Sequence, residues 1–125
     1  VLVMPMVKGS EVKIDTNVVV FMHYTGYTID SLGIKHVFDS SFDRGEPFLM
    51  EPGAKKVIKG WEEAVMEMHE LDQVRIVVPS EAGYGTKGVP PLIMPDETLY
   101  FDLYAVKVLP KKAGTEREQV NLIQE

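Results

Sequence analysis

The residue types that usually carry enzyme chemistry are sparse in this chain of 125 residues. Cysteine is absent, which excludes disulfides, thiolate nucleophiles and cysteine-based metal sites. The histidines His23, His36 and His69 stand at no zinc-ligand spacing, and neither an HExxH nor a GxSxG motif occurs. The stretch GYGTKG at 83–88 leads into prolines rather than into a helix, so no helix N-terminus would face a phosphate. The sequence therefore predicts no metal site, no cofactor and no covalent mechanism.

Aromatic side chains beside turns and loops are the feature that the chain offers instead. They are Tyr24, Phe38, Phe48, Trp61, Tyr84 and Phe101. Trp61 is the only tryptophan, and it follows Gly60 on the first turn of the one convincing helix. Aromatic residues at the ends of elements often belong to an ordinary core, but they also form apolar pockets that hold one or two polar groups. On the residues alone, both interpretations stay open.

The elements that must position these side chains are mostly strands. Alternating polarity and β-branched or aromatic residues predict strands at 11–14, 17–29, 37–42, 48–50, 72–79 and 98–109. We expect a bulge or bend at Gly26 and a hairpin turn at Gly33. The segment 80–97 is rich in glycine and proline and is predicted to be a long loop.

A single helix is predicted at 57–68, where apolar residues recur at helical spacing. One helix cannot cover both faces of a flat sheet, so we expect a strongly twisted antiparallel sheet that curls around it. The predicted fold class is therefore α+β.

Length and composition favour one ordinary domain, with 45% hydrophobic and 26% charged residues. A formal charge of −6 argues against nucleic acid or an anionic membrane as a main partner. No apolar run approaches the roughly 20 residues of a membrane helix. We expect a domain at 1–109 that includes an N-terminal strand, and a polar tail or linker at 110–125. The chain starts with valine, which suggests a processed or excised form, and a cytoplasmic location is the default expectation.

Five sequence segments occur in the following order along the chain: HYTGY, VFDSSFDRGEPF, VIKGWEEAV, GYG and TLYFDLYAVKVL. Together they closely resemble the FKBP-type peptidyl-prolyl cis–trans isomerases, from about Thr16 to Leu109. The resemblance implies a half-barrel of antiparallel strands wrapped around one short α-helix. It also implies that Trp61 forms the floor of a proline pocket and that Gly60 leaves room beside the indole.

The same resemblance implies the roles of individual residues. The implied catalytic residues are Asp39, Tyr84, Phe38, Trp61 and Phe101. The implied substrate- and ligand-binding residues are Tyr24, Arg44, Phe48, Val57, Ile58, Val89, Leu92 and Ile93. Among these, the backbone N–H of Ile58 and the hydroxyl of Tyr84 would donate to ligand carbonyls, while Arg44 would position Asp39 as an acceptor.

The implied function is a peptidyl-prolyl isomerase that assists protein folding by speeding rotation about Xaa–Pro bonds. The alternative is a catalytically weak binding or chaperone module that docks partners through the pocket and the flap at 86–95. Implied partners are proline-containing peptides and client proteins, together with the macrolides rapamycin and tacrolimus, and the implied state is a monomer. Departures from the family pattern bear on macrolide affinity and substrate preference. They are a longer hairpin at 28–37, Val89 where many members carry histidine, Leu92 and Met94 as variations in the flap, and Lys56 where an acidic or neutral residue is common.

Overall fold

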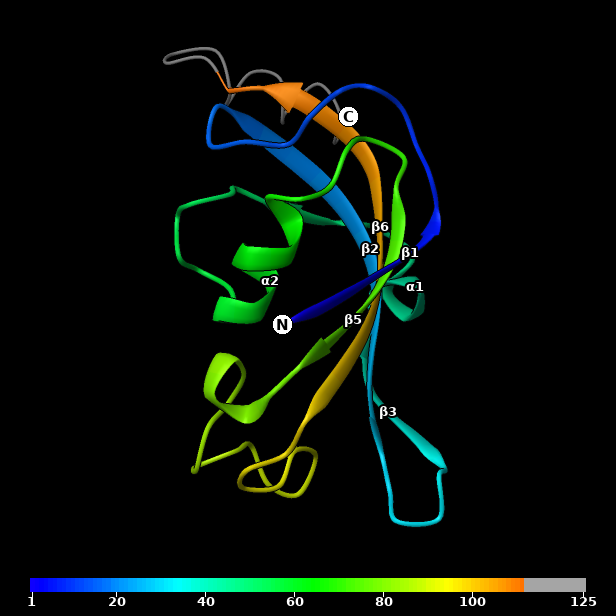
Figure 1. Ribbon diagram of the computed structural model, residues 1–125, viewed down its shortest axis with the longest axis vertical. Coiled ribbons are helices and arrows are strands. Elements are labelled where there is room, and N and C mark those ends of the chain that lie inside the picture. The colour runs from blue at the N-terminus through cyan, green and yellow to red at the C-terminus, as the bar shows by residue number, and fades with distance from the viewer. Residues whose placement is uncertain (112–125) are drawn as a thin grey trace.

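The computed structural model describes residues 1–111 and shows one strongly twisted antiparallel sheet (Figure 1). Its strands are β1 (Leu2–Val7), β2 (Val18–Ile29), β3 (Lys35–Ser40), β4 (Phe48–Met50), β5 (Gln73–Val78) and β6 (Leu99–Pro110). The order across the sheet is β1-β5-β6-β2-β3, and β4 pairs with the other end of β2. The predicted fold class is confirmed. Most of the predicted tail at 110–125 lies outside the described residues.

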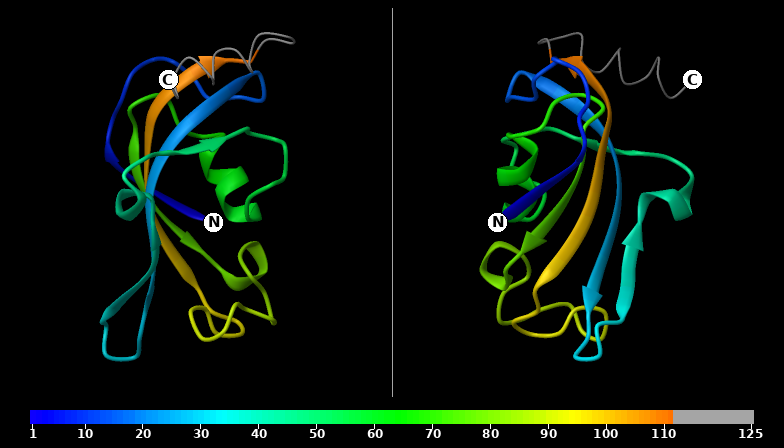
Figure 2. Two further views of the ribbon diagram at one scale, coloured as in Figure 1. Left: turned by 180° about the vertical axis from the view of Figure 1, so that it is seen from behind. Right: turned by 45° about the vertical axis from the view of Figure 1, so that its right-hand side comes forward.

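The helix α2 (Lys59–Val65) lies against the concave face of this sheet (Figures 1 and 2). It is shorter than the predicted helix at 57–68. Ile58 has an extended backbone and precedes the first turn. After Val65 the chain tightens, because Glu67 and Met68 donate to carbonyls only three residues back. Apolar spacing continued beyond both ends of the helix, and so it overstated the length.

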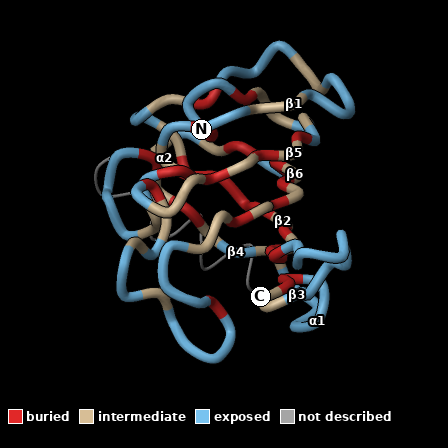
Figure 3. Tube along the Cα trace, turned by 60° about the horizontal axis from the view of Figure 1, so that its bottom comes forward, coloured by how far each residue is buried: buried red, intermediate tan, exposed pale blue. Residues whose placement is uncertain are grey.

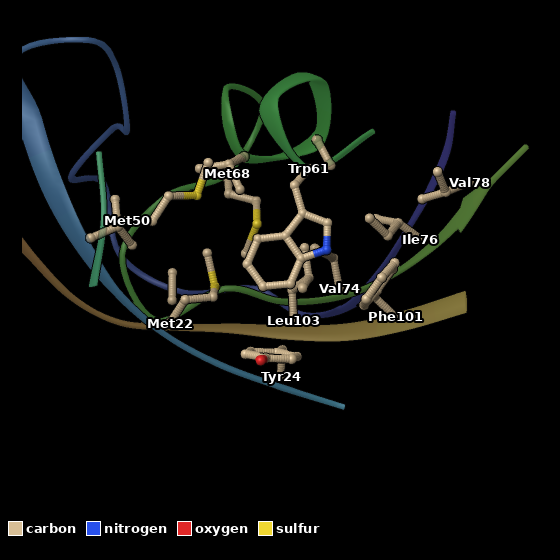
Figure 4. Packing of buried hydrophobic residues seen from close by; sticks show 14 of the residues in the cluster. Met22, Tyr24, Met50, Trp61, Met68, Val74, Ile76, Val78, Phe101 and Leu103 are labelled. Atoms are coloured by element: carbon tan, nitrogen blue, oxygen red, sulfur yellow. The ribbon is translucent and has the colours of Figure 1, made fainter. Parts of the chain in front are cut away.

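The core fills the space between α2 and the concave face of the sheet. Along β5, and along β6 as far as Ala105, every second residue is buried, so these strands turn one face toward the helix (Figure 3). Met22, Met50 and Met68 pack together on one side of Trp61, with Val74 and Leu103 beneath it (Figure 4). The unbranched methionines adapt to the irregular gap that a short helix leaves over a curved sheet.

The N-terminal segment differs from the prediction. Residues 11–14 form no strand and make a single bridge, Lys13 with His69. The edge strand is instead β1, which pairs with β5 and breaks register after Pro5. Since β1 is mostly exposed and contains a proline, it lacks the alternation that reveals a half-buried strand.

The hairpin between β2 and β3 follows the prediction. The pairing of the two strands shifts register between Gly26 and Tyr27, and Gly33 has a φ of 80° in the turn. The predicted strand at 37–42 is wrong at its end, because the chain enters a one-turn helix, α1 (Ser41–Arg44). The buried Ser41 hydroxyl accepts the N–H of Tyr24 at 2.7 Å and so ties α1 to β2. A short 3₁₀ turn, η1 (Ser80–Ala82), also interrupts the predicted loop at 80–97.

At Gly60 the backbone of α2 packs directly against Val78 of β5. A Cβ atom at this position would lie 2.6 Å from Cγ1 and 2.9 Å from Cγ2 of Val78. The expectation that Gly60 leaves room beside Trp61 is therefore wrong. Val78 occupies the space, and the glycine permits close packing of helix on sheet.

We expect Gly60→Ala to lower the free energy of unfolding by about 1–3 kcal/mol, because the new methyl group overpacks a rigid contact. Urea unfolding of the variant and the wild type measures this difference. The matched control is the same substitution in a Val78→Ala background, where the clashing methyl groups are gone and the cost should fall clearly. An equal cost in both backgrounds would contradict the packing explanation.

Candidate functional site

A cavity of about 400 Å³ opens where the first turn of α2 faces the sheet. Its lining is mainly aromatic and aliphatic, with a few polar groups. The lining residues are Tyr24, Phe38, Asp39, Phe48, Lys55, Lys56, Val57, Ile58, Trp61, Tyr84 and Phe101. They come from β2, β3, β4, β6, α2, the loop before α2 and the loop after η1. The cavity is within the range of small-molecule sites.

Trp61 is held in the cavity by edge-to-face contacts with three other rings. Its ring centroid lies 4.9 Å from Tyr24, 5.5 Å from Phe101 and 6.1 Å from Phe48, with interplanar angles of 77° to 90°. Figure 4 shows the indole projecting from α2 toward the sheet, with Tyr24 and Phe101 beside it. Aromatic pairs in this geometry contribute more stabilisation than the burial of their surface area alone. The indole is 5% exposed, so its position is fixed by packing.

Gly26 makes the sheet side of this arrangement possible. A Cβ atom there would lie 2.8 Å from the rings of both Phe38 and Phe101. Phe38 and Phe101 pack edge to face with centroids 5.7 Å apart. The glycine therefore lets two aromatic walls lie directly over the strand.

A polar network closes one side of the pocket. Tyr24 Oη donates to Asp39 Oδ2 at 2.5 Å, Arg44 Nη1 donates to Asp39 Oδ1 at 2.7 Å, and Arg44 Nη2 donates to Tyr24 Oη at 2.7 Å. Burial raises the pKa of Asp39, but the hydrogen bonds from Tyr24 and Arg44 outweigh burial and hold that pKa below its ordinary value. Burial and the bond to Asp39 raise the pKa of Tyr24. The bonds to Asp39 and Tyr24 also raise the pKa of Arg44.

Most of the residues implied by the resemblance come together in this cavity. Those that line it are Tyr24, Phe38, Asp39, Phe48, Val57, Ile58, Trp61, Tyr84 and Phe101. Arg44 reaches the site through its bonds to Asp39 and Tyr24. Ile93 is 4% exposed and belongs to the core. Val89 and Leu92, at 44% and 61% exposed, lie on the flap and are not among the lining residues.

Two lining residues, Lys55 and Lys56, were not predicted as site residues. The only signal in the sequence was the unusual lysine at position 56. Their placement depends on a tertiary contact, because Glu62 of α2 accepts the backbone N–H groups of Gly53 and Lys55, both at 2.8 Å. No short-range pattern reports such a contact.

Two hydrogen-bond donors at the cavity are available to a ligand. Within residues 1–111 the backbone N–H of Ile58 has no acceptor, because this residue precedes the first helical hydrogen bond. The Tyr84 hydroxyl likewise has no partner in this part of the chain, and the side chain is 42% exposed. Both residues line a cavity that is mainly aromatic and aliphatic, so the two donors suit an amide-rich ligand.

Among residues 1–111, no group of three or more His, Asp or Glu side chains lies close enough together to hold a metal ion. No helix in the same range is both long and apolar enough to span a membrane.

Comparison with known proteins shows which family this chain belongs to. Residues 9–106 match the family described as FKBP-type peptidyl-prolyl cis-trans isomerase. The peptidyl-prolyl cis-trans isomerase of Schizosaccharomyces pombe is 40% identical over 92 residues, which cover 74% of this chain and 79% of the relative. FK506-binding protein 1 of Kluyveromyces lactis is 43% identical over 89 residues, with 71% and 75% covered. The chain belongs to the FKBP-type peptidyl-prolyl cis-trans isomerase family, which confirms the resemblance.

Longer proteins are also similar to this chain. Human peptidyl-prolyl cis-trans isomerase FKBP2 is 40% identical over 90 residues, and the match spans 61% of that relative's length. The crystal structure of FkpA from Escherichia coli aligns with a TM-score of 0.75 and 31% identity, covering 88% of this chain and 48% of that chain. This likeness supports the observed fold.

We expect the Asp39 network to stabilise the fold above acidic pH. The pKa of Asp39 is lower in the folded than in the unfolded chain, so its contribution is present in full above the unfolded value of about 3.9 and is lost as pH falls through the folded value. Because the group is partly exposed, Asp39→Asn should cost at most about 1 kcal/mol at pH 7. Urea unfolding from pH 7 to pH 2.5 should show the difference from wild type shrinking.

Asp43→Asn is the matched control, because Asp43 is an exposed neighbour in α1 with no side-chain bond among the described residues. It should stay close to wild type throughout. A cost of Asp39→Asn that is the same at pH 7 and pH 2.5 would contradict the assignment.

Proposed function

We propose that this chain accelerates cis–trans rotation about Xaa–Pro bonds, with the proline ring seated on Trp61. The observation that carries the proposal is the cavity itself, whose indole floor is fixed by three rings and flanked by two available donors. A pyrrolidine ring is apolar and rigid, so it matches an aromatic floor. The carbonyl groups on either side of the proline match the donors at Ile58 and Tyr84.

The chemistry follows from desolvation and selective binding. Rotation about a peptide bond has a barrier of about 18–20 kcal/mol, most of it from amide resonance. Resonance separates charge, so it weakens when the amide leaves water for a cavity walled by aromatic rings. Walls and donors that fit the twisted amide better than the planar one lower the barrier. A thousandfold acceleration requires about 4 kcal/mol, which needs no nucleophile.

Asp39 acts in this proposal as a fixed acceptor and dipole rather than as a proton-transfer group. Both of its oxygens already accept hydrogen bonds, and its lowered pKa keeps it ionised. The network with Tyr24 and Arg44 holds the wall of the pocket against Trp61. Removing its charge should therefore weaken turnover without abolishing it.

The proposed partners are proline-containing peptides and client proteins. The same aromatic cavity is proposed to bind macrolides such as rapamycin and tacrolimus. The names of the FK506-binding relatives support this assignment, and so does the complete aromatic lining. The exposed positions of Val89 and Leu92 on the flap suggest that they would touch the outer part of such a ligand.

Isomerisation of a Xaa–Pro peptide, followed by exchange NMR or a protease-coupled assay, tests the proposal. We expect turnover that rapamycin inhibits, and a loss of about 10–100-fold in kcat/KM for Trp61→Leu, which removes the floor but keeps an apolar side chain. Circular dichroism must show that the variant is folded. A folded wild-type chain that binds proline peptides without turnover would instead support the binding-module alternative.

Smaller changes test the polar groups separately. Tyr84→Phe should lower kcat/KM by about 3–10-fold, the effect of one hydrogen bond. Asp39→Asn should lower it by a similar factor. The control is Tyr100→Phe, because Tyr100 stacks on Tyr27 and is not among the residues that line the cavity. Complete loss of turnover in a folded Asp39→Asn variant would contradict the role given to this carboxylate.

A further inference from the structure

The rim of the pocket carries a charge opposite in sign to that of the whole chain. Lys55 and Lys56 line the cavity on the side of the loop between β4 and α2. Among the lining residues Asp39 is the one acid, and it is already bonded to Tyr24 and Arg44. The chain as a whole has a formal charge of −6. A ligand that approaches this cavity therefore meets local positive charge on an acidic protein.

The backbone of the loop holds these lysines in place. Glu62 accepts hydrogen bonds from the N–H groups of Gly53 and Lys55, which fastens the loop to α2 at the residue after Trp61. Lys55 has a φ of 59°, a left-handed conformation that is uncommon for a residue with a Cβ atom. Ala54 N–H also donates to the Glu51 carbonyl at 3.2 Å. The loop is thus fixed relative to the floor of the pocket.

Neither lysine is neutralised by another side chain in the part of the chain that the structure describes. The ion pairs in residues 1–111 are made by other cations, including Arg44, Arg75, Lys107 and Lys111. Glu62 is the acid that the loop contacts, and each of its oxygens already accepts a backbone N–H. Exposed lysines are often only solvated, but these two are adjacent, lie on a fixed loop and line one cavity.

We propose that Lys55 and Lys56 select clients with an acidic side chain next to the proline. This inference rests on the proposed function. A proline ring seated on Trp61 places the Cα atoms of its neighbours about 3.8 Å away along the peptide, within reach of long lysine side chains at the rim. A carboxylate there would pair with ammonium groups that have no other partner. The same rim repels a lysine at that position.

The preference acts on binding rather than on the rotation step. The ammonium groups lie at the rim and do not touch the rotating bond, so they hold the planar and the twisted amide equally. Such uniform binding lowers KM and leaves kcat unchanged. This split separates charge selection from a direct role in catalysis.

The test uses peptides that differ only at the residue before the proline, which is Glu, Gln or Lys, and a second set varied at the residue after it. Exchange NMR at low and high salt gives kcat and KM for each. In at least one set we expect kcat/KM to be about fivefold higher for Glu than for Lys at low salt, as for one or two exposed ion pairs, and mainly through KM. High salt should reduce this ratio.

The double variant Lys55→Met/Lys56→Met should bring the ratio close to one, by raising KM for the Glu peptide and lowering KM for the Lys peptide. Lys8→Met is the matched control, because it removes one exposed charge just after β1 and outside the cavity. Equal kcat/KM for Glu and Lys peptides in both sets, or a preference that survives in the double variant, would overturn the inference.

Failure of the proposed function would look different. In that case no peptide is turned over, and the fluorescence of Trp61, the only tryptophan, still reports binding of the same peptides. A lower Kd for Glu than for Lys peptides that disappears in the double variant would uphold charge selection at a pure binding site. Equal Kd values would overturn it.

Discussion

The close approach of α2 to the sheet at Gly60 is the constraint on which the pocket depends. The helix sits against Val78 with no side chain between them, and the next residue along the chain is Trp61. The depth of the helix therefore sets the height of the indole above Tyr24 and Phe101. A seven-residue helix is not stable alone, so its position comes from this packing and from its buried face. The rigidity of the Trp61 floor therefore depends on the contact between Gly60 and Val78.

A second glycine, Gly26, allows close packing on the sheet side of the cavity. Gly26 lets the rings of Phe38 and Phe101, which pack edge to face, approach β2 in space that any Cβ atom would fill. The two glycines act on opposite sides of one cavity, one by bringing the helix close and the other by admitting rings over the strand. A protein interior is close-packed, and an open apolar cavity persists only where its walls are supported from behind. Here the walls are supported by edge-to-face ring contacts and by the buried side chains of Val74 and Leu103 beneath Trp61.

The sequence predicted those elements whose burial is one-sided. Buried residues alternate with less buried ones along β5 and along β6 as far as Ala105, and this periodicity is visible in the sequence. β1 was missed because it is mostly exposed at an edge, and α1 because one turn is too short to show a period. The site residues were predicted from the family resemblance. Spacing alone left the aromatics as either core or pocket. The position of Lys55 depends on a hydrogen bond from its backbone N–H to the side chain of Glu62, which hydrophobic periodicity does not reveal.

The electrostatics of the site fit a reaction that moves no proton. Each carboxylate oxygen of Asp39 already accepts a hydrogen bond, one from Tyr24 and one from Arg44, and the pKa of Asp39 is held low. A general base needs a pKa near the working pH, so this carboxylate is tuned away from that role. Rotation about an amide instead requires loss of solvent and a fit to the twisted form, which aromatic walls provide. Charge is kept to the side of the cavity in the Asp39 network and at the rim in Lys55 and Lys56, where it orients and selects without interacting with the rotating bond.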